Sequence, residues 1–173
     1  MNSYVVGFVF DKSGSNVVLI RKSKPKWQAG MLNGVGGKIE DAEDRNVQAM
    51  VREFREEAGV DTEEKDWTPF HLAMYRDASG LPTVNVYFFK MFSDEVYAEA
   101  YTAEREEIEK VPVSHVICDP ATCLPVPNLR WLLLLALDSY VSKSYTTDWN
   151  GTAILPLKRP KVTQNRQDVR ANA

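Results

Sequence analysis

Cysteine, long hydrophobic runs and low-complexity segments are all scarce in this chain of 173 residues. Its two cysteines, Cys118 and Cys123, are too few for a disulfide framework and are not spaced as zinc ligands, so we expect reduced thiols. The longest uninterrupted apolar run is the seven-residue stretch 131–137, whereas a transmembrane helix needs about 20 residues. Nine glycines and nine prolines exclude a collagen-like or low-complexity chain. We therefore expect an ordinary globular protein that does not cross a membrane.

The chain also lacks signs of targeting or of a second domain. Residues 1–4 carry neither a basic region nor an apolar signal core, so we expect a cytoplasmic protein. The length suits one compact domain. We place this domain at residues 1–157 and expect a polar, basic tail at residues 158–173. Nothing in the sequence discriminates between a monomer and a homodimer.

Negative charge is concentrated in one part of the chain. Residues 38–66 carry eleven acidic and five basic side chains, a net charge of −6, whereas the formal charge of the whole chain is −3. Such a run is either a solvated helix face or a cluster of carboxylates that binds hard divalent cations. The acidic balance of the whole chain argues against broad nucleic-acid binding through a basic surface.

Hydrophobic periodicity predicts a mixed α/β domain. The expected strands span residues 4–10, 17–20, 70–76, 83–92 and 108–113, of which the first two form a hairpin. An amphipathic helix is expected from residue 44 to residue 58, closed by Gly59. A second helix, apolar on most sides, is expected from residue 128 to residue 141 and is predicted to be buried.

The first of these helices gathers acidic side chains on one side. At 100° per residue, Arg52, Glu53, Glu56 and Glu57 fall within a sector of about 140° beside the apolar stripe. Crowded carboxylates repel one another, and Mg²⁺ or Mn²⁺ would relieve that repulsion. Arg52 and Glu56 lie four residues apart, so that one can orient the other. The periodicity alone leaves open an exposed acidic helix with ordinary surface pairs.

A glycine-rich stretch, residues 33–37, lies before this helix. Gly36 and Gly37 let the backbone approach a phosphate or a metal ion closely, and backbone carbonyl groups can ligate the metal. Lys38 can contribute a positive charge to a phosphate. Taken alone, each glycine is more often a turn residue; together with the acidic helix, the stretch favours a phosphate and metal site.

The order of these residues resembles the signature of the Nudix (MutT-like) hydrolases, G-x5-E-x7-R-E-U-x-E-E-x-G-U, in which U is apolar. The matching residues are Gly37, Glu43, Arg52, Glu53, Phe54, Glu56, Glu57, Gly59 and Val60. The second half matches at every defined position, but eight residues instead of seven separate Glu43 from Arg52. Either Glu43 or Asp44 is therefore the first acid of the motif. The strand order over residues 4–141 also resembles the single-domain α/β/α sandwich of this family, with its mixed sheet.

This resemblance implies a hydrolase that uses Mg²⁺ or Mn²⁺ to cleave a pyrophosphate bond of a nucleoside triphosphate. A purine or oxidised purine deoxynucleotide is the expected substrate, and a nucleoside monophosphate and pyrophosphate are the products. The resemblance also implies the site residues. The metal ligands would be Glu53, Glu56, Glu57 and the carbonyl of Gly37, with Arg52 in the same catalytic group. Glu53 is our first choice of general base, and the loop glutamates Glu104, Glu106 and Glu107 are additional candidates.

The motif says little about the rest of the substrate. Asn33 resembles the position at which relatives that act on purine nucleotides place an asparagine against the base, although Asn-Gly is equally a favoured turn pair. Asn128 and Trp131 are further candidates for base contacts, with a helix cap and a core aromatic as the alternatives. Dinucleoside polyphosphates, nucleotide sugars, ADP-ribose and capped RNA 5′ ends are alternative substrates. A non-catalytic nucleotide-sensing module is an alternative function.

Overall fold

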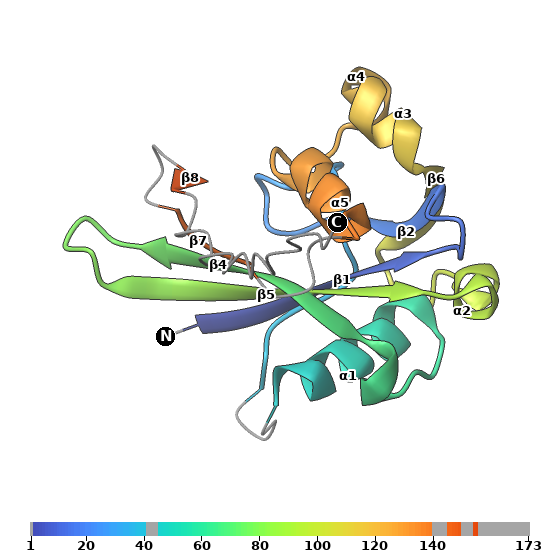
Figure 1. Cartoon of the computed structure of the whole chain (residues 1–173), viewed down its shortest axis with the longest axis horizontal. Helices are drawn as coiled ribbons and strands as arrows, with labels where there is room; N and C mark the ends of the chain where they lie inside the picture. The colour runs from blue at the N-terminus through green and yellow to red at the C-terminus, as the bar shows by residue number, and fades with distance from the viewer. Residues whose placement is uncertain (1, 41–44, 140–144, 150–153, 156–173) are drawn as a thin grey trace, which may run out of the picture.

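A mixed β-sheet runs through the middle of the molecule (Figure 1). The computed structural model describes residues 2–40, 45–139, 145–149 and 154–155. Its strands follow the order β3-β2-β1-β5-β4-β7-β8, and β6 pairs with β2. The strand bounds are β1 (Asn2–Phe10), β2 (Asn16–Arg21), β3 (Leu32–Asn33), β4 (Thr68–Arg76), β5 (Pro82–Phe92), β6 (Glu107–Pro112), β7 (Tyr145–Trp149) and β8 (Ile154–Leu155). The expected mixed sheet is therefore confirmed.

The pairs around β2 are all antiparallel, whereas parallel and antiparallel pairs alternate from β1 to β8. β1 runs parallel to β5, β5 antiparallel to β4, and β4 parallel to β7. The expected hairpin of β1 and β2 is present, but it is paired over only two positions, Val9 with Val18 and Phe10 with Val17. Further along, β2 pairs with β3 instead, with Ile20 opposite Asn33. The glycine-rich segment after β3 then crosses to β1, where Val35 bridges to Gly7.

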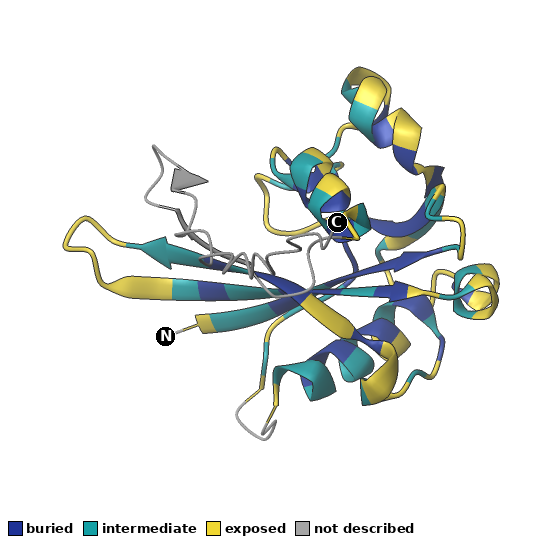
Figure 2. Ribbon diagram, viewed as in Figure 1, coloured by how far each residue is buried: buried dark blue, intermediate teal, exposed yellow. Residues whose placement is uncertain are grey.

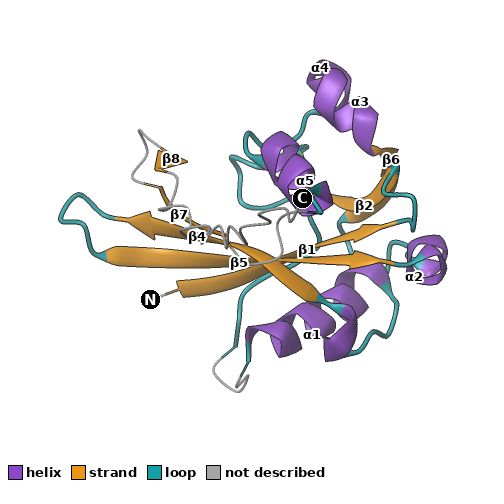
Figure 3. Ribbon diagram, viewed as in Figure 1, coloured by secondary structure: helices purple, strands orange, loops and turns teal. Residues whose placement is uncertain are grey.

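Helices cover both faces of the sheet, which confirms the expected sandwich (Figure 3). The helical segments are α1 (Asn46–Ala58), the 3₁₀ helix η1 (Glu64–Asp66), α2 (Asp94–Glu99), α3 (Val113–Cys118), α4 (Pro120–Cys123) and α5 (Leu129–Leu137). Figure 1 shows α1 on one face and α5 on the opposite face. Among the described helices, none combines the length and the hydrophobicity of a membrane span.

Each face of the sheet has its own apolar core (Figure 2). On the α1 side, the helix buries Met50 and Phe54 together with two alanines. The ring of Phe54 contacts Trp67 edge-on, with 5.3 Å between the ring centroids. On the α5 side, the helix buries three leucines and Ala136 against the phenylalanines of β1, β4 and β5. The position of α1 is therefore fixed by packing of the apolar side that adjoins its acidic residues.

Both long helices differ slightly from the expected ranges. α1 begins at Asn46 after an extended Arg45, whereas we expected a start at Asp44, which lies outside the described residues. Its end at Gly59 is as expected, because this glycine takes a left-handed conformation with φ of 70°. α5 ends at Leu137, where the apolar run stops and Asp138 turns extended. The expected continuation to residue 141 is therefore wrong at residues 138–139, and residues 140 and 141 lie outside the description.

The remaining expectations concern the ends of the chain and the thiols. The expected tail, residues 158–173, lies outside the described residues, and the domain boundary at residue 157 stays a prediction. Cys118 is exposed and Cys123 is buried, and both are free.

Candidate active site

Two acidic side chains of α1 face the glycine-rich segment that crosses to β1. Glu53 and Glu57 lie one helical turn apart, and their side chains are only 12% and 13% exposed. The backbone N–H of Gly36 donates a 2.9 Å hydrogen bond to Oε2 of Glu57. A Cβ atom on Gly37 would lie 2.4–2.5 Å from the carboxylate atoms of Glu53. Because Gly37 has no side chain, its backbone lies directly against the carboxylate of Glu53, and Gly36 contacts the carboxylate of Glu57 through its N–H.

Arg52 connects two glutamates of α1 to each other and to the backbone that follows the glycine-rich segment. Its Nη1 atom lies 2.8 Å from Oε1 of Glu53 and 2.9 Å from Oε2 of Glu56. Its Nη2 atom donates a 3.0 Å hydrogen bond to the carbonyl oxygen of Lys38. The ion pair that the four-residue spacing of Arg52 and Glu56 predicts is present. Glu56 is 46% exposed, so it is more accessible to solvent than Glu53.

A lysine that the sequence analysis did not single out joins the site. Lys22 follows the last residue of β2, and its Nζ lies 3.5 Å from Oε1 of Glu57. The same ammonium forms an ion pair with Glu106, just before β6. Of the three loop glutamates proposed as bases, the structure thus links Glu106 to the site, whereas Glu104 and Glu107 are exposed.

Glu106 also fixes the start of the loop between β2 and β3. Its Oε1 accepts hydrogen bonds from the hydroxyl of Ser23 at 2.7 Å and from the backbone N–H of Lys24 at 3.1 Å, as well as from the backbone N–H of Ser23. These contacts join two segments far apart in the sequence, and no local spacing predicts them. The sequence places Lys22 just after the end of an expected strand, and this position alone does not indicate a role in the site.

The electrostatics of the site centre on Glu57. Burial raises the pKa of this carboxyl to about 7. The ammonium of Lys22 and the N–H of Gly36 act to lower this pKa, whereas the charges of Glu53 and Glu106 act to raise it. Burial alone would also raise the pKa of Glu106, but hydrogen bonds from Lys22 and Ser23 outweigh it and leave that pKa lowered. The site therefore contains more carboxylate charge than its own cations neutralise easily.

The donor atoms of this site fit a hard divalent cation. Within the described part of the chain, no three acidic, histidine or cysteine side chains converge as a preformed metal site. Glu53 and Glu57 nevertheless present carboxylate oxygens, the ligands that Mg²⁺ and Mn²⁺ prefer. The nearby carbonyl of Gly37 accepts a 2.9 Å hydrogen bond from Val5, and a carbonyl oxygen has a second lone pair. A bound cation would relieve the repulsion that contributes to the raised pKa of Glu57.

A cleft of about 630 Å³ lies next to this acidic site, and Gly36 and Gly37 line both. Its apolar lining comes mainly from β1, β5 and the loop between β2 and β3, with Tyr75 of β4 and Val126 before α5 completing it. The polar side chains of the lining include those of Lys22, Gln28, Asn33 and Asn128. A concave site of this volume, mostly apolar with a few polar groups, is typical of small-molecule binding.

Two of the four residues expected to bind substrate line this cleft. Asn33 does so while its Oδ1 accepts a 2.8 Å hydrogen bond from the backbone N–H of Gly34. Asn128 precedes α5, but its side chain makes no capping hydrogen bond there. The ring of Trp131 instead lies edge-on to His71, at 5.2 Å between centroids, and Trp131 is not among the lining residues. Lys38 is exposed, also outside the lining.

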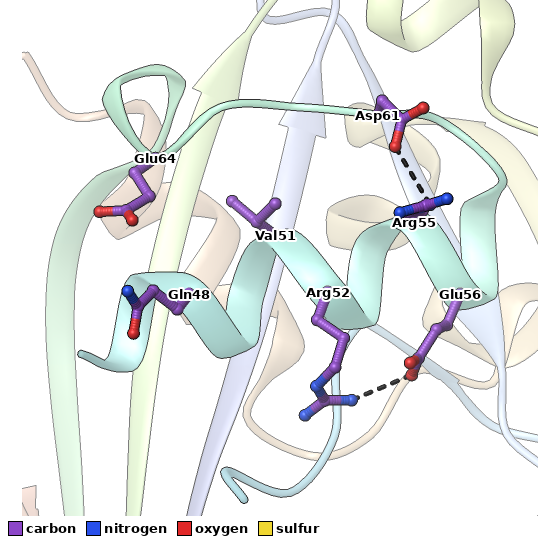
Figure 4. Close-up of a pocket in the computed structure, with 7 residues that line it drawn as sticks. All are labelled: Gln48, Val51, Arg52, Arg55, Glu56, Asp61 and Glu64. Atoms are coloured by element: carbon purple, nitrogen blue, oxygen red, sulfur yellow. Dashed lines mark hydrogen bonds and ion pairs between the residues drawn. The ribbon is translucent and has the colours of Figure 1, made fainter. Parts of the chain in front are cut away.

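A second hollow, of about 410 Å³, lies on the outer side of α1 (Figure 4). Its lining residues are Gln48, Val51, Arg52, Arg55, Glu56, Asp61 and Glu64. Figure 4 shows Arg55 directed at Asp61, with 3.1 Å between Nε and Oδ1, and Arg52 directed at Glu56. Because both arginines are already neutralised by neighbouring acids, this hollow is a poor anion site.

The two candidates for the first acid of the motif, Glu43 and Asp44, lie outside the described residues.

Similarity to known proteins extends over most of the chain. The family model described as NUDIX domain matches residues 2–130. A MutT protein from Bacillus halodurans is similar in structure, with a TM-score of 0.58, 17% identity, and coverage of 90% of this chain and 95% of that one. A structure of MutT from Aliivibrio salmonicida or Vibrio cholerae gives a TM-score of 0.55 at 21% identity, covering 77% of this chain and 97% of its own.

The NUDIX domain of Shewanella oneidensis NrtR, solved with ADP-ribose, gives a TM-score of 0.57 at 15% identity, covering 78% of this chain and 84% of that one. At these identities the structural likeness supports the fold alone. No curated protein matches the sequence.

Proposed function

Because the chain belongs to the NUDIX domain family, we propose that it hydrolyses a pyrophosphate bond of a nucleoside triphosphate with the help of Mg²⁺ or Mn²⁺. One observation carries this proposal. Two largely buried carboxylates, those of Glu53 and Glu57, lie against Gly36 and Gly37, and the same glycines line a cleft of about 630 Å³. The arrangement offers oxygen ligands for a cation beside a space suited to a small molecule.

The proposed roles follow from the contacts of each side chain. Glu53, Glu56, Glu57 and the carbonyl of Gly37 hold the cation, which neutralises phosphate charge and lowers the pKa of bound water. Arg52 positions Glu53 and Glu56 through its ion pairs. We propose Glu53 as the general base that takes the proton of the attacking water.

Glu106 is the alternative base. Support for this role comes from its ion pair with Lys22, which also contacts Glu57, so that Glu106 lies close to the proposed cation ligands. Lys22 supplies positive charge to the carboxylates of both Glu57 and Glu106.

The base of the nucleotide is proposed to occupy the cleft, beside Asn33 and Asn128. An amide group both donates and accepts hydrogen bonds, so it can read the edge of a purine.

We expect Asn33→Ala to lower the preference for purine over pyrimidine nucleotides by about 5- to 150-fold, because an unpaired polar group in a buried pocket costs about 1–3 kcal/mol. An equal loss for both classes of base would instead identify Asn33 as a turn residue, and Asn128 would become the leading candidate.

A substrate panel tests the proposed function directly. The purified chain is incubated with Mg²⁺ and purine, oxidised purine or pyrimidine nucleoside triphosphates, and in parallel with dinucleoside polyphosphates, nucleotide sugars and capped RNA. ADP-ribose is included because a domain of similar fold was solved with it. We expect a nucleoside monophosphate and pyrophosphate from a triphosphate, and no products with a chelator. Binding without turnover of any compound would favour the nucleotide-sensing alternative.

A further inference from the structure

One large aromatic side chain is exposed at the cleft. Trp27, in the loop between β2 and β3, is 63% exposed and lines the cleft. The other large hydrophobic side chains that are exposed in the described part of the chain are Leu81, Phe92, Tyr101, Leu124 and Leu134, and none of them lines it. An indole ring that remains in water at the edge of a binding cleft has a large apolar face available for a flat ligand.

The loop that carries Trp27 is closed by backbone hydrogen bonds at its base. Lys22 accepts a 2.8 Å hydrogen bond from Gly30 through its carbonyl and donates a 2.9 Å hydrogen bond to Met31 through its N–H. The guanidinium of Arg21 donates a further 2.7 Å hydrogen bond to the carbonyl of Gly30. Within the loop, the N–H of Gln28 bonds to the carbonyl of Pro25 at 2.8 Å. The exposed ring is therefore carried on an ordered loop, which lowers the entropic cost of binding.

The residue after Trp27 connects this loop to the proposed base-reading amide. Oε1 of Gln28 accepts a 3.3 Å hydrogen bond from Nδ2 of Asn33. Because Oδ1 of Asn33 accepts from Gly34, both polar atoms of this amide are held in one orientation. Gln28, Asn33 and Trp27 all line the cleft. An aromatic face thus lines the same cleft as two amide groups, and this combination suits a planar heterocycle with hydrogen-bonding edges.

We propose that Trp27 is a specificity-determining residue that stacks on the heterocyclic base of the bound nucleotide, and that Gln28 is a positioning residue for the amide of Asn33. This inference rests on the proposed function, since it assigns the base end of the same cleft. Stacking is insensitive to the identity of the base, because every base has a π-face. Trp27 therefore favours ligands that carry a base over ligands that consist of phosphates alone. The amide of Asn33, oriented by Gln28, discriminates between different bases.

The test uses two probes that differ by the base. One is a guanosine triphosphate analogue with a methylene group between the α- and β-phosphates, and the other is inorganic tripolyphosphate. Dissociation constants are measured by calorimetry with Mg²⁺ for the wild type, Trp27→Ala, Trp27→Phe and Gln28→Ala. Leu81→Ala is the matched control, because it removes an exposed apolar side chain outside the cleft. Thermal melts verify that each variant folds.

We expect Trp27→Ala to raise the dissociation constant of the nucleotide analogue about 5- to 150-fold, while tripolyphosphate binding and the Leu81→Ala variant stay unchanged. Trp27→Phe should restore most of the affinity, because the π-face is retained. Gln28→Ala should weaken binding of the guanine analogue more than binding of the matching uracil analogue. As an independent readout, the analogue should quench tryptophan fluorescence in the wild type and much less in Trp27→Phe.

Two results would overturn this inference while the proposed function stands. In both, the wild type hydrolyses a nucleoside triphosphate. Either Trp27→Ala then binds the analogue as tightly as the wild type does, or it loses affinity equally for the analogue and for tripolyphosphate. The second result would mean that Trp27 only supports the loop. If the wild type neither binds the analogue nor hydrolyses any compound in the panel, the proposed function fails and this inference fails with it.

Discussion

At the scale of single residues, the site is governed by how Glu57 is neutralised. Its carboxyl group is held between the ammonium of Lys22, at 3.5 Å, and the N–H of Gly36, at 2.9 Å. Removal from water outweighs both contacts, so the pKa of Glu57 is raised to about 7. A carboxyl that resists ionisation in the metal-free protein gains most from a divalent cation, because the cation stabilises its charged form.

The raised pKa of Glu57 gives the metal-free protein a distinct pH dependence. Between about pH 4.5, the ordinary value for this group, and pH 7, the folded state binds more protons at Glu57 than the unfolded state does. The free energy of unfolding should therefore fall as the pH rises through this range, by on the order of 3 kcal/mol at most. Urea unfolding with a chelator at pH 5 and pH 8 measures this change. The Glu57→Gln variant has no titratable group at this position. If its free energy of unfolding changes with pH as much as that of the wild type, Glu57 is not the cause of the change.

Substitution of Glu53 tests its proposed role as the general base. Glu53→Gln keeps the size of the side chain and removes its basicity, so we expect kcat to fall by about 10²- to 10⁴-fold. Steady-state kinetics with the best substrate of the panel measures the loss. Glu104→Gln is the control, because Glu104 is exposed. If Glu53→Gln keeps its full rate and Glu106→Gln loses it, the base is Glu106 instead.

At the scale of elements, α1 and the glycine segment act as a pair. The apolar side of α1 packs against the sheet. The glycine-rich segment, residues 33–37, crosses from β3 to β1 and contacts the acidic side of the helix. The lack of a side chain on Gly36 permits the close approach of the segment to β1, and the lack of one on Gly37 permits its close approach to α1. Gly36, with φ of 151°, would place a Cβ atom 2.1 Å from the carbonyl oxygen of Val5. Gly37 would place its Cβ atom against the carboxylate of Glu53 instead.

These two glycines should therefore respond differently to alanine. Gly36→Ala forces the backbone of β1 to shift and imposes strain, so we expect a loss of stability of roughly 2 kcal/mol or more. Gly37→Ala displaces the carboxylate of Glu53, so we expect activity to fall strongly while the free energy of unfolding changes by less than about 1 kcal/mol. Chemical denaturation and kinetics of both variants provide the comparison. The reverse pattern would mean that Gly37 is the structural glycine of the pair.

The elements also show which parts of the fold a sequence reveals. The strands β1, β4 and β5 and the helix α1 are long enough for their apolar periodicity to be recognised. The helices α2, α3 and α4 contain four to six residues, too few for a periodic pattern, and were not predicted. The Arg52–Glu56 pair follows from local spacing, whereas the contact between Lys22 and Glu106 depends on the pairing of β2 with β6. Trp27 carries no local signal, because a loop tryptophan lines a cleft only through the tertiary fold.

At the scale of the whole molecule, cation binding should couple to folding. A cation that binds the folded state alone raises stability by RT ln(1 + [M]/Kd), about 2.7 kcal/mol at a hundredfold excess over Kd. We expect Mg²⁺ to raise the melting temperature of the wild type at pH 8, relative to chelator. The double variant Glu53→Gln and Glu57→Gln should show no such rise. A rise of equal size in this variant would place the cation elsewhere.

The closed base of the β2–β3 loop has a consequence for the divergence of this protein. Lys22 bonds directly to Gly30 and Met31, so the seven residues between Lys22 and Gly30 form a cassette that enters and leaves the sheet at one point. Such a cassette can change in length or sequence without moving the carboxylates of α1, which are anchored from the other face of the sheet. The loop that carries Trp27 and the helix that carries the carboxylates are therefore structurally separable, and we expect a substitution within residues 23–29 to leave the carboxylates of α1 in place.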